Sequence, residues 1–357
     1  METTVRLDDK KAIQEIDASH MLQVIENFPD QIQEAIQCTH ASNLVDFIKI
    51  DNVVLTGMGA SGISGDFVTS LFRDKIDTPI VVNKDYMLPK WVHKNTLAVF
   101  LSYSGNTEET ISAFKEAYQK KCHMIAISSN GKLQELCENR KVTCVSIPGG
   151  LQPRAATAYL LIPLLFILKK NGLLRHPIES DIDEVLHISK TCCNEYGMDT
   201  PEDQNLAKQI ALSLHATIPS MYGWGFYDAV AQRWKTQINE NSKMISCYDV
   251  LPEASHNDIV GWAANSEITK QFSCVLIRDH HEESIYMRAR LEFMKTLFND
   301  VSSHVIEIQP QGKSRLAKAL SLILLGDFVS CYLALLRAVD PTPIDAIQEL
   351  KNRLAAL

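Results

Sequence analysis

The chain has 357 residues, of which 46% are hydrophobic and 22% charged, a composition that allows a large buried core and, at this length, favours two domains over one. The formal net charge of -8 makes the surface as a whole unfavourable for nucleic acid and for anionic lipid. We therefore expect no nucleic-acid partner, and a phosphate-bearing ligand would have to be attracted by local groups.

The amino-terminal residues 1–11 are polar and charged, with no apolar run behind them, so we expect neither a secretory signal nor a transit peptide and predict a cytoplasmic protein. The apolar stretch 155–168 contains Pro163 and is shorter than the roughly 18 residues of a membrane span, which favours a buried helix and predicts no membrane partner. The 9 cysteines include no Cys-x-x-Cys pair and no zinc-ligand spacing. They indicate free thiols in a reducing compartment.

In the first half of the chain, short apolar runs alternate with longer segments of helical period, a pattern typical of parallel strands joined by helical crossovers. The predicted strands are residues 53–56, 80–82, 97–102, 123–128 and 143–147, and the predicted helices are residues 62–72, 107–119, 132–138 and 154–170. Each helix is long enough to cover one face of a sheet.

Residues 172–204 are polar and contain prolines, and we predict the domain connection there. The pattern then restarts, with predicted extended segments at 218–222, 243–247, 274–278 and 304–308 and predicted helices at 227–238 and 314–337. About thirty residues at the start of the chain and about fifteen at its end are predicted to form extra helices.

Gly-x-Gly occurs twice in the same setting, at residues 57–59 and 223–225, each time between a strand end and a helix. Two glycines are weak evidence of duplication, but the matching order of elements supports two copies of one unit. The sequence therefore predicts the α/β class, with two doubly wound, flavodoxin-like domains of parallel sheets flanked by helices, plus terminal helices. Residues 1–190 are assigned to the first domain with its leading helices, and residues 191–357 to the second with its carboxyl-terminal helix.

Residues 57–62 read Gly-Met-Gly-Ala-Ser-Gly and fit the pattern Gly-x-Gly-x-x-Gly between a strand and a helix. Dinucleotide-binding folds carry this pattern, and Asp85 is a candidate for the acid that would contact the ribose. The pattern is not specific, because backbone amides and the positive end of a helix favour any phosphate. Gly59 and Ser61 are therefore candidate phosphate-binding residues for a dinucleotide or for a sugar.

The next strand end, residues 102–107, reads Ser-Tyr-Ser-Gly-Asn-Thr. Ser102, Ser104 and Thr107 can each donate a hydrogen bond to a phosphate oxygen, and Gly105 permits a tight turn. A plain N-cap would explain one of these hydroxyls but not all of them. Open α/β sheets bind ligands at such strand ends, so we predict a phosphate site here rather than a dinucleotide site.

Together, these two loops resemble the sugar isomerase (SIS) domain, whose members bind phosphosugars in a hydroxyl-rich loop. Other segments resemble the bifunctional phosphoglucose/phosphomannose isomerases: residues 153–156 (Pro-Arg-Ala-Ala), 239–243 (Asn-Glu-Asn-Ser-Lys), 253–257 (Glu-Ala-Ser-His-Asn) and 340–343 (Asp-Pro-Thr-Pro), with Leu350-Lys351. They span nearly the whole chain in the order of that family. The resemblance implies two SIS-type domains and an isomerase that interconverts glucose 6-phosphate, and mannose 6-phosphate, with fructose 6-phosphate through an enediol.

By the same resemblance, Glu240 would move the proton between C1 and C2 of the sugar. His256 and Lys351 would assist opening of the sugar ring, and Arg154 would face the enediolate. The family also implies a homodimer whose active site takes a histidine from the partner subunit, so that His256 would act across an interface.

These residue types suit the reaction, because a carboxylate can move a carbon-bound proton, an imidazole can exchange protons and a guanidinium can offset enediolate charge. Each residue also has a plain structural alternative. Glu240 could be a helix-end glutamate beside Lys243, and His256 a solvated loop residue. Arg154 could extend its charge from an apolar helix to solvent, and Lys351 could face solvent on a terminal helix. Only the motifs around them favour catalysis, and an enediol mechanism requires neither a metal nor a cofactor.

Two other functions remain open at this point. An NAD-dependent oxidoreductase is supported by residues 57–62 alone. A non-catalytic phosphosugar-binding protein would use the same loops, but it would not need Glu240, Arg154 and His256 together, and the chain carries no basic patch or DNA-binding appendage. The sequence does not decide between glucose and mannose phosphates, which differ only at C2.

Overall fold

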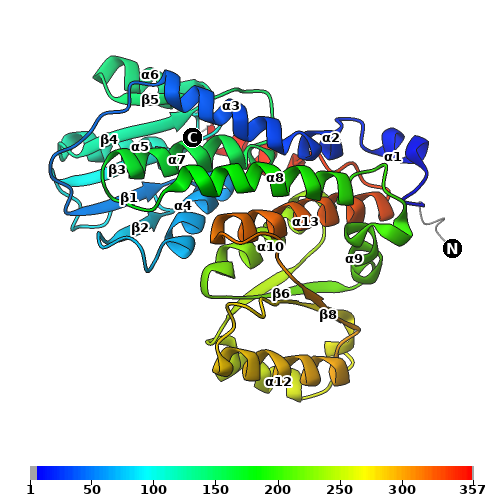
Figure 1. Ribbon diagram of the computed structural model, residues 1–357. Coiled ribbons are helices and arrows are strands. Elements are labelled where there is room, and N and C mark those ends of the chain that lie inside the picture. Colours follow the sequence, from blue (N-terminus) through cyan, green and yellow to red (C-terminus); the bar gives the residue numbers. More distant parts are fainter. Residues whose placement is uncertain (1–5, 356–357) are drawn as a thin grey trace. The chain divides into compact units, whose positions relative to one another are not determined.

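The computed structural model describes residues 6–355, which divide into two compact units (Figure 1). The amino unit contains Asn27–Leu186 and Ser314–Leu316. The carboxyl unit contains the described residues before Asn27, His187–Lys313 and the described residues from Ala317 onward. The change from one unit to the other falls within the helix α8 (Ile178–Tyr196).

The amino unit is built on a parallel sheet with the strand order β2-β1-β3-β4-β5. Its strands are β1 (Asn52–Thr56), β2 (Ile80–Asn83), β3 (Thr96–Leu101), β4 (His123–Ser128) and β5 (Thr143–Ser146). Its helices, besides the start of α8, are α3 (Phe28–Ala41), α4 (Gly59–Leu71), α5 (Glu108–Gln119), α6 (Gly131–Arg140) and α7 (Thr157–Lys170). The strand order changes direction between β1 and β3, the place where open α/β sheets bind ligands.

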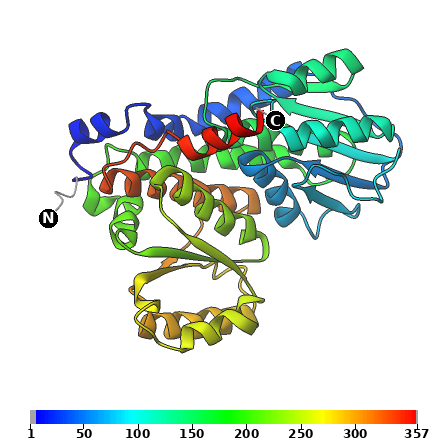
Figure 2. The same cartoon turned by 180° about the vertical axis from the view of Figure 1, so that it is seen from behind.

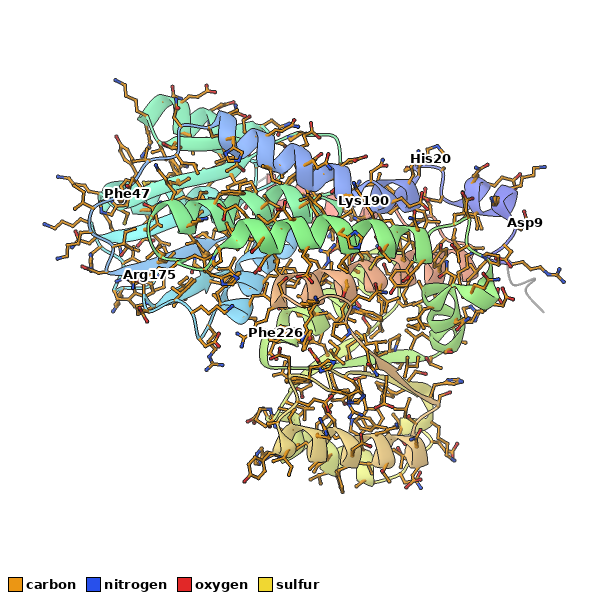
Figure 3. All side chains as sticks on the ribbon, viewed as in Figure 1. Asp9, His20, Phe47, Arg175, Lys190 and Phe226 are labelled. Carbon is orange, nitrogen blue, oxygen red and sulfur yellow. The ribbon has the colours of Figure 1, made fainter. Side chains whose placement is uncertain are left out.

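Both faces of this sheet are covered, and β3 is accordingly buried along its whole length. On one face, Phe100 of β3 packs edge-on against Phe114 of α5, with ring centroids 5.1 Å apart. On the other face, α4 lies close to the sheet because Gly65 has no side chain, and a Cβ there would lie 3.2 Å from Val82. Side chains fill the layers between helices and sheet (Figure 3).

The carboxyl unit contains a second parallel sheet with the strand order β7-β6-β8-β9. Its strands are β6 (Ile218–Trp224), β7 (Cys247–Leu251), β8 (Phe272–Ile277) and β9 (His304–Ile308). Its helices, with the end of α8, are α1 (Lys10–Ile16), α2 (Met21–Glu26), α9 (Leu206–Leu214), α10 (Asp228–Ser242), α11 (Ala254–Ala263), α12 (Ile285–Val301), α13 (Arg315–Leu336) and α14 (Asp345–Ala355). Figures 1 and 2 show α12 on one face of this sheet and α10 on the other. The shared strand order confirms the predicted class of two parallel α/β sheets flanked by helices.

The leading helices α1 and α2 group with the carboxyl unit, whereas we assigned them to the amino-terminal domain. Polar contacts explain the difference. The buried Lys208 places its Nζ 2.9 Å from Oδ1 of Asp8, and Glu26 accepts a hydrogen bond from the backbone N–H of Met198 at 3.1 Å. These contacts join residues far apart in sequence, which composition and periodicity do not report.

The change of unit between Leu186 and His187 falls within the predicted domain connection, residues 172–204, most of which form α8. Two other local predictions differ from the structure. Residues 243–247 are not a strand: Lys243 ends α10 with a φ of +54°, and β7 begins at Cys247. His256 is not in a loop, because α11 begins at Ala254.

The helix α13 is 22 residues long with a mean hydropathy of 2.1, so it could cross a membrane by length and composition alone. Its apolar window is completely buried in the structure, as in the central helix of a packed core. It also holds Asp327 and Ser330, both of which make buried hydrogen bonds to α10. These features favour a core helix over a membrane span.

Candidate active site

The connection between β1 and α4 consists of Gly57 and Met58, because α4 begins at Gly59. Gly59 has a φ of +51°, and a Cβ at Gly62 would lie 2.5 Å from the carbonyl oxygen of Gly57. A side chain at either position would strain the turn or push the strand and the helix apart. The glycines therefore let the first amides of α4 lie close to the end of β1, where an anion could approach them.

The loop after β3 carries the three predicted hydroxyls. Ser102 is buried, and its Oγ lies 3.0 Å from Oγ1 of Thr107. Ser104 is partly exposed, and its Oγ accepts a long hydrogen bond from the backbone N–H of Asn106 at 3.4 Å. Gly105 has a φ of +68°, which favours glycine at the centre of the turn.

Thr107 occupies the N-cap position of α5, but its hydroxyl contacts Ser102 and not an amide of its own helix. The alternative of a plain N-cap is therefore wrong for Thr107. Within the described residues, no side-chain cap covers the first turn of α5, whose amides carry the positive end of the helix dipole.

One hydrogen bond joins the two loops, from the backbone N–H of Tyr103 to Oγ of Ser61 at 3.3 Å. The structure thus brings Gly59 and Ser61 to the same sheet edge as the hydroxyl-bearing loop, between β1 and β3. We call residues 57–62 and 102–107 together the strand-end cradle.

A third loop, residues 128–131, supports the cradle and was not among the predicted site residues. Oγ of Ser128 donates a hydrogen bond to the carbonyl oxygen of Ser102 at 2.8 Å. The backbone of this loop approaches so closely that a Cβ on Gly105 would lie 1.7 Å from the carbonyl oxygen of Asn130. Its sequence, Ser-Ser-Asn-Gly, begins with the last residue of β4, so the rule that polar residues gather at strand ends could have found it.

Arg154 lies in the short 3-10 helix η1 (Pro153–Ala155), which precedes α7, and not at the start of the apolar helix as predicted. Its side chain is 2% exposed, so the alternative of a charge extended to solvent is wrong. The backbone N–H of Leu151 donates to the hydroxyl of Tyr103 at 3.1 Å. The turn that carries Arg154 is therefore attached to the cradle within the amino unit.

Glu240 lies in the last turn of α10 in the carboxyl unit and is half-buried. Its neighbours are held on both sides. Oδ1 of Asn239 accepts a hydrogen bond from Oγ of Ser246 at 2.6 Å, and Nδ2 of Asn241 donates to Oγ of Ser330 at 2.9 Å. The backbone that carries the Glu240 carboxylate is therefore tied to two other segments of the unit.

Lys243 ends this helix in the left-handed conformation and places its ammonium group over the last turn. Nζ of Lys243 donates to the carbonyl oxygens of Asn241 at 3.2 Å, of Asp340 at 2.8 Å and of Pro341 at 2.8 Å. A cation at the carboxyl end of a helix is favourable, because the last carbonyls carry partial negative charge. Two of the motifs quoted above, residues 239–243 and 340–343, therefore meet at one contact.

His256 and Lys351 lie on two further helices of the carboxyl unit. His256 is in the first turn of α11 and Lys351 is in α14, and both are exposed. Neither side chain has a hydrogen-bond partner among the described residues. Within one chain, their surroundings fit the solvent-facing alternatives.

Comparisons with known proteins match both units. The SIS domain family matches residues 46–147, and the bacterial phospho-glucose isomerase C-terminal SIS domain family matches residues 203–354. A bifunctional phosphoglucose/phosphomannose isomerase from Caldicellulosiruptor bescii is 42% identical over 94% of this chain and 99% of that protein. The protein of the same name from Aquifex aeolicus is 34% identical over 87% of this chain and 92% of its own length. The chain belongs to this isomerase family.

For this family member, the SIS match contains the whole cradle, and the carboxyl-terminal match contains Glu240, His256 and Lys351. Arg154 lies between the two matched regions. A solved glucose-6-phosphate isomerase like protein from Thermus thermophilus has the same fold, with a TM-score of 0.65 and 17% identity over 96% of this chain and 99% of that one. The resemblance stated from the sequence motifs is thereby confirmed.

Among the described residues, no group of three or more His, Cys, Asp or Glu side chains is arranged to hold a metal ion. All nine cysteines are free thiols, and Cys137, Cys192, Cys274 and Cys331 are buried.

Proposed function

We propose that the chain is an aldose–ketose isomerase that interconverts glucose 6-phosphate, and also mannose 6-phosphate, with fructose 6-phosphate. The observation that carries the proposal is the strand-end cradle, which combines buried hydroxyls with uncapped helix amides in a member of a family named for these sugars. Gly59, Ser61, Ser102, Ser104 and Thr107 would bind the phosphate group.

Glu240 is the proposed base. The open-chain aldose loses its C2 proton to the base while its carbonyl oxygen gains a proton, which gives an enediol, and return of a proton to C1 with loss of the O2 proton gives the ketose. The half-buried position of Glu240 suits proton transfer from carbon, and the anchored neighbours hold its helix turn in place.

Arg154 would stabilise the negative charge that develops on the enediolate oxygens, because a guanidinium stays charged at any working pH and this one is buried. His256 and Lys351 would move protons between the anomeric hydroxyl and the ring oxygen during ring opening. We also propose a homodimer, since the exposed His256 could reach a substrate on a partner subunit. The site would then lie at the subunit interface of a cytoplasmic enzyme.

The test is a coupled assay on fructose 6-phosphate that measures glucose 6-phosphate and mannose 6-phosphate separately. Glu240→Gln keeps the size of the side chain and removes the base, so kcat should fall by about 10²-fold or more for both products. The matched control is Glu267→Gln, which replaces an exposed glutamate of the same unit that pairs with Lys270 on the surface, and it should leave kcat unchanged.

An unchanged kcat for Glu240→Gln would assign the base elsewhere. A wild-type chain that binds fructose 6-phosphate but forms neither product would contradict the proposed activity and favour a phosphosugar-binding protein.

The reaction transfers protons only, so we expect it to proceed without metal or cofactor. After dialysis against EDTA, the wild-type kcat should equal that of the untreated protein. A loss of activity that zinc restores would contradict this expectation.

A further inference from the structure

The loop after β8 occupies the place in the carboxyl sheet that the hydroxyl-bearing loop occupies in the amino sheet. The order β7-β6-β8-β9 repeats the order β2-β1-β3-β4, so β6 and β8 correspond to β1 and β3. The glycine turn is repeated as well, because Gly225 after β6 has a φ of +57° and Gly59 after β1 has a φ of +51°. Geometry alone would therefore place an anion site at each sheet.

The loop after β8, residues 278–283, carries charges where the cradle carries hydroxyls. Oδ2 of Asp279 accepts a hydrogen bond from the hydroxyl of Tyr227 at 2.6 Å and lies 2.9 Å from Nζ of Lys318. Asp279 is 3% exposed, and Tyr227 is fully buried. The strand end thus has a hydroxyl and an ammonium group directed at one carboxylate of the chain itself.

The carboxylate of Glu283 accepts a hydrogen bond from a backbone amide of the same loop. Oε1 of Glu283 accepts a hydrogen bond from the backbone N–H of Asp279 at 3.0 Å, and Oδ1 of Asp279 accepts one from the backbone N–H of His281 at 3.1 Å. Strand-end amides of this kind hold phosphate oxygens in anion-binding loops. Here they are already satisfied by carboxylate oxygens.

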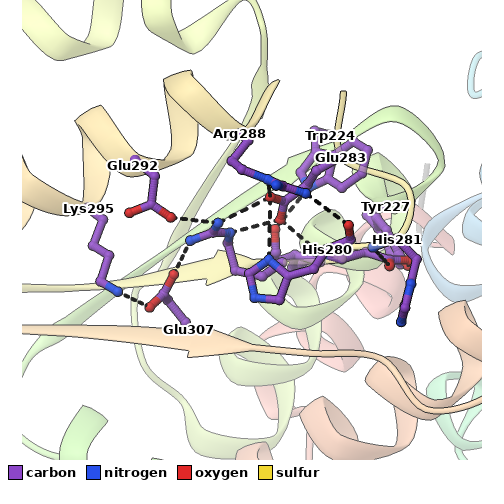
Figure 4. Close-up of polar contacts among 12 residues, drawn as sticks. Trp224, Tyr227, His280, His281, Glu283, Arg288, Glu292, Lys295 and Glu307 are labelled. Carbon is purple, nitrogen blue, oxygen red and sulfur yellow. Dashed lines mark hydrogen bonds and ion pairs between the residues drawn. The ribbon is translucent and has the colours of Figure 1, made fainter. Parts of the chain in front are cut away.

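Arg278, a second cation of the cluster, is also paired (Figure 4), and Nε of Arg288 lies 3.6 Å from Oε2 of Glu283. Arg278 is 1% exposed, contacts both carboxylate oxygens of Glu283 at 2.8 and 3.1 Å, and contacts Glu292 at 2.8 Å. It also pairs with Glu307, which in turn pairs with Lys295. A phosphate entering this cluster would find its cations already paired with carboxylates.

The helix that follows is capped, in contrast to α5. Oγ of Ser284, the N-cap residue of α12, accepts a hydrogen bond from the backbone N–H of Met287 at 3.2 Å.

The carboxyl group of Asp279 is charged at neutral pH. Burial alone would raise the pKa of Asp279, but the hydrogen bonds from Tyr227 and Lys318 hold this pKa below its usual value.

We infer that the carboxylates of Asp279 and Glu283 fill the second strand-end anion site, so that each chain holds one phosphosugar, at the amino sheet. The two sheets share a topology but differ in this loop, and the carboxyl unit is left to contribute side chains such as Glu240.

The first test is calorimetric titration of the full chain with fructose 6-phosphate. The wild type should bind one molecule per chain, and the double variant Ser102→Ala/Thr107→Val should bind none. In that double variant, orthophosphate should not raise the melting temperature. Two molecules bound per wild-type chain, or phosphate stabilisation that survives in the double variant, would overturn the inference.

The second test adds Asp279→Ser to the double variant, which removes the carboxylate shared by Tyr227 and Lys318 and leaves Nζ of Lys318 with its contact to Oε1 of Glu282 at 3.1 Å. Orthophosphate at about five times the dissociation constant of the new site should then raise the melting temperature by about 2–4 °C. Asp300→Ser, which removes an exposed carboxylate from the other end of α12, is the matched control and should gain nothing.

A folded Asp279→Ser variant without phosphate-dependent stabilisation would also overturn the inference. If that variant does not fold, as circular dichroism would show, the stoichiometry of the wild type and the double variant decides. The inference rests on the proposed phosphate site at the amino sheet. None of these measurements uses isomerase activity, so failure of the inference, seen as a second bound molecule per chain, is distinguishable from failure of the proposed function, seen as absence of product.

Discussion

At the scale of single residues, the cradle depends on glycines whose neighbours leave no room for a side chain. Gly105 has a φ of +68° and lies against the backbone of Asn130. Gly131 has a φ of +78° and lies against the carbonyl oxygen of Ser104. Each of these two loops therefore fixes the shape of the other. The three hydroxyls keep their positions because the backbone that carries them cannot relax outward into a larger turn.

We expect Gly105→Ala to raise the KM for fructose 6-phosphate and to destabilise the fold. Gly172→Ala is a matched control, because Gly172 has a nearly equal φ of +70° but no atom within 4 Å of the point where a Cβ would lie. The control should lose about 1–2 kcal/mol of stability from the left-handed backbone alone and keep its KM. Steady-state kinetics and thermal melts would measure both, and equal KM values for the two variants would contradict the role given to the Gly105 contact.

The pH dependence of stability follows from the carboxylates at the β8 end. Burial alone would raise the pKa of Glu283, but its contacts with Arg278 and with the amide of Asp279 lower it below the usual value. A carboxyl group with a lowered pKa contributes stability above its unfolded-state pKa, and this contribution is lost as the pH falls through the folded-state pKa.

We therefore expect Glu283→Gln to destabilise the carboxyl unit most at pH 7, and the difference from wild type to shrink below about pH 4, near the unfolded-state pKa of glutamate. Urea unfolding followed by tryptophan fluorescence is a suitable measurement, because Trp224, Trp234 and Trp262 all lie in this unit. A difference in midpoint that is the same at pH 7 and at pH 3 would contradict the ion-pair explanation.

At the scale of helices and strands, α10 is the element on which the proposed chemistry depends. Arg233 and Gln237 contact Asp327 of α13, and one turn further on Asn241 contacts Ser330. These buried polar contacts recur along one side of α10 and allow only one alignment with α13. This alignment fixes the position, along α13, of the α10 turn that carries the proposed base Glu240.

The end of α10 can be tested through its cap. Lys243→Met removes an ammonium group that contacts three carbonyl oxygens, so the last turn should loosen and kcat should fall about tenfold, with KM nearly unchanged. Lys270→Met, which removes an exposed lysine of the same unit, should leave both constants unchanged. A change in KM alone would mean that the cap affects substrate binding and not the position of the base.

The elements that sequence reasoning identified are those with a clear period. Buried strands such as β3 and β4 are continuous apolar runs between turn residues, and the polar residues at their ends pointed to the cradle. The helix α8 was not predicted, because its residues lie in the polar, proline-containing stretch 172–204, although its buried residues Ile178, Ile182 and Val185 recur at helical spacing.

The helix α12 was not predicted because its sequence lacks a clear helical period. Its apolar residues lie on more than one side, since Leu291 and Met294 are buried while Ile285 and Phe293 are exposed, and this spread obscures the period. The charged loop after β8 also went unrecognised as a site, because its meaning depends on Tyr227 and Lys318, which only the folded chain brings to it.

At the scale of the whole molecule, the proposed homodimer predicts complementation between two inactive chains. If Glu240 and His256 of one site come from different subunits, a heterodimer of Glu240→Gln and His256→Ala chains contains one intact site and one site with both defects. Mixed, refolded chains should recover about one quarter of the wild-type activity, because half the dimers are heterodimers with one working site of two.

Each variant alone should be nearly inactive, and size-exclusion chromatography should give the same dimer for all samples. Absence of recovery in a mixture that forms dimers would contradict a site shared between subunits.

The carboxyl unit contains residues from both ends of the chain, which affects the order in which its parts can fold during synthesis. Asp8 leaves the ribosome 200 residues before its partner Lys208, and the amino unit is completed in the meantime except for Ser314–Leu316. During synthesis, α1 and α2 therefore lack their partners in the carboxyl unit while the amino unit can already form its core. Truncated chains that end before Lys208 should leave these first helices open to protease, and the full-length protein should bury them.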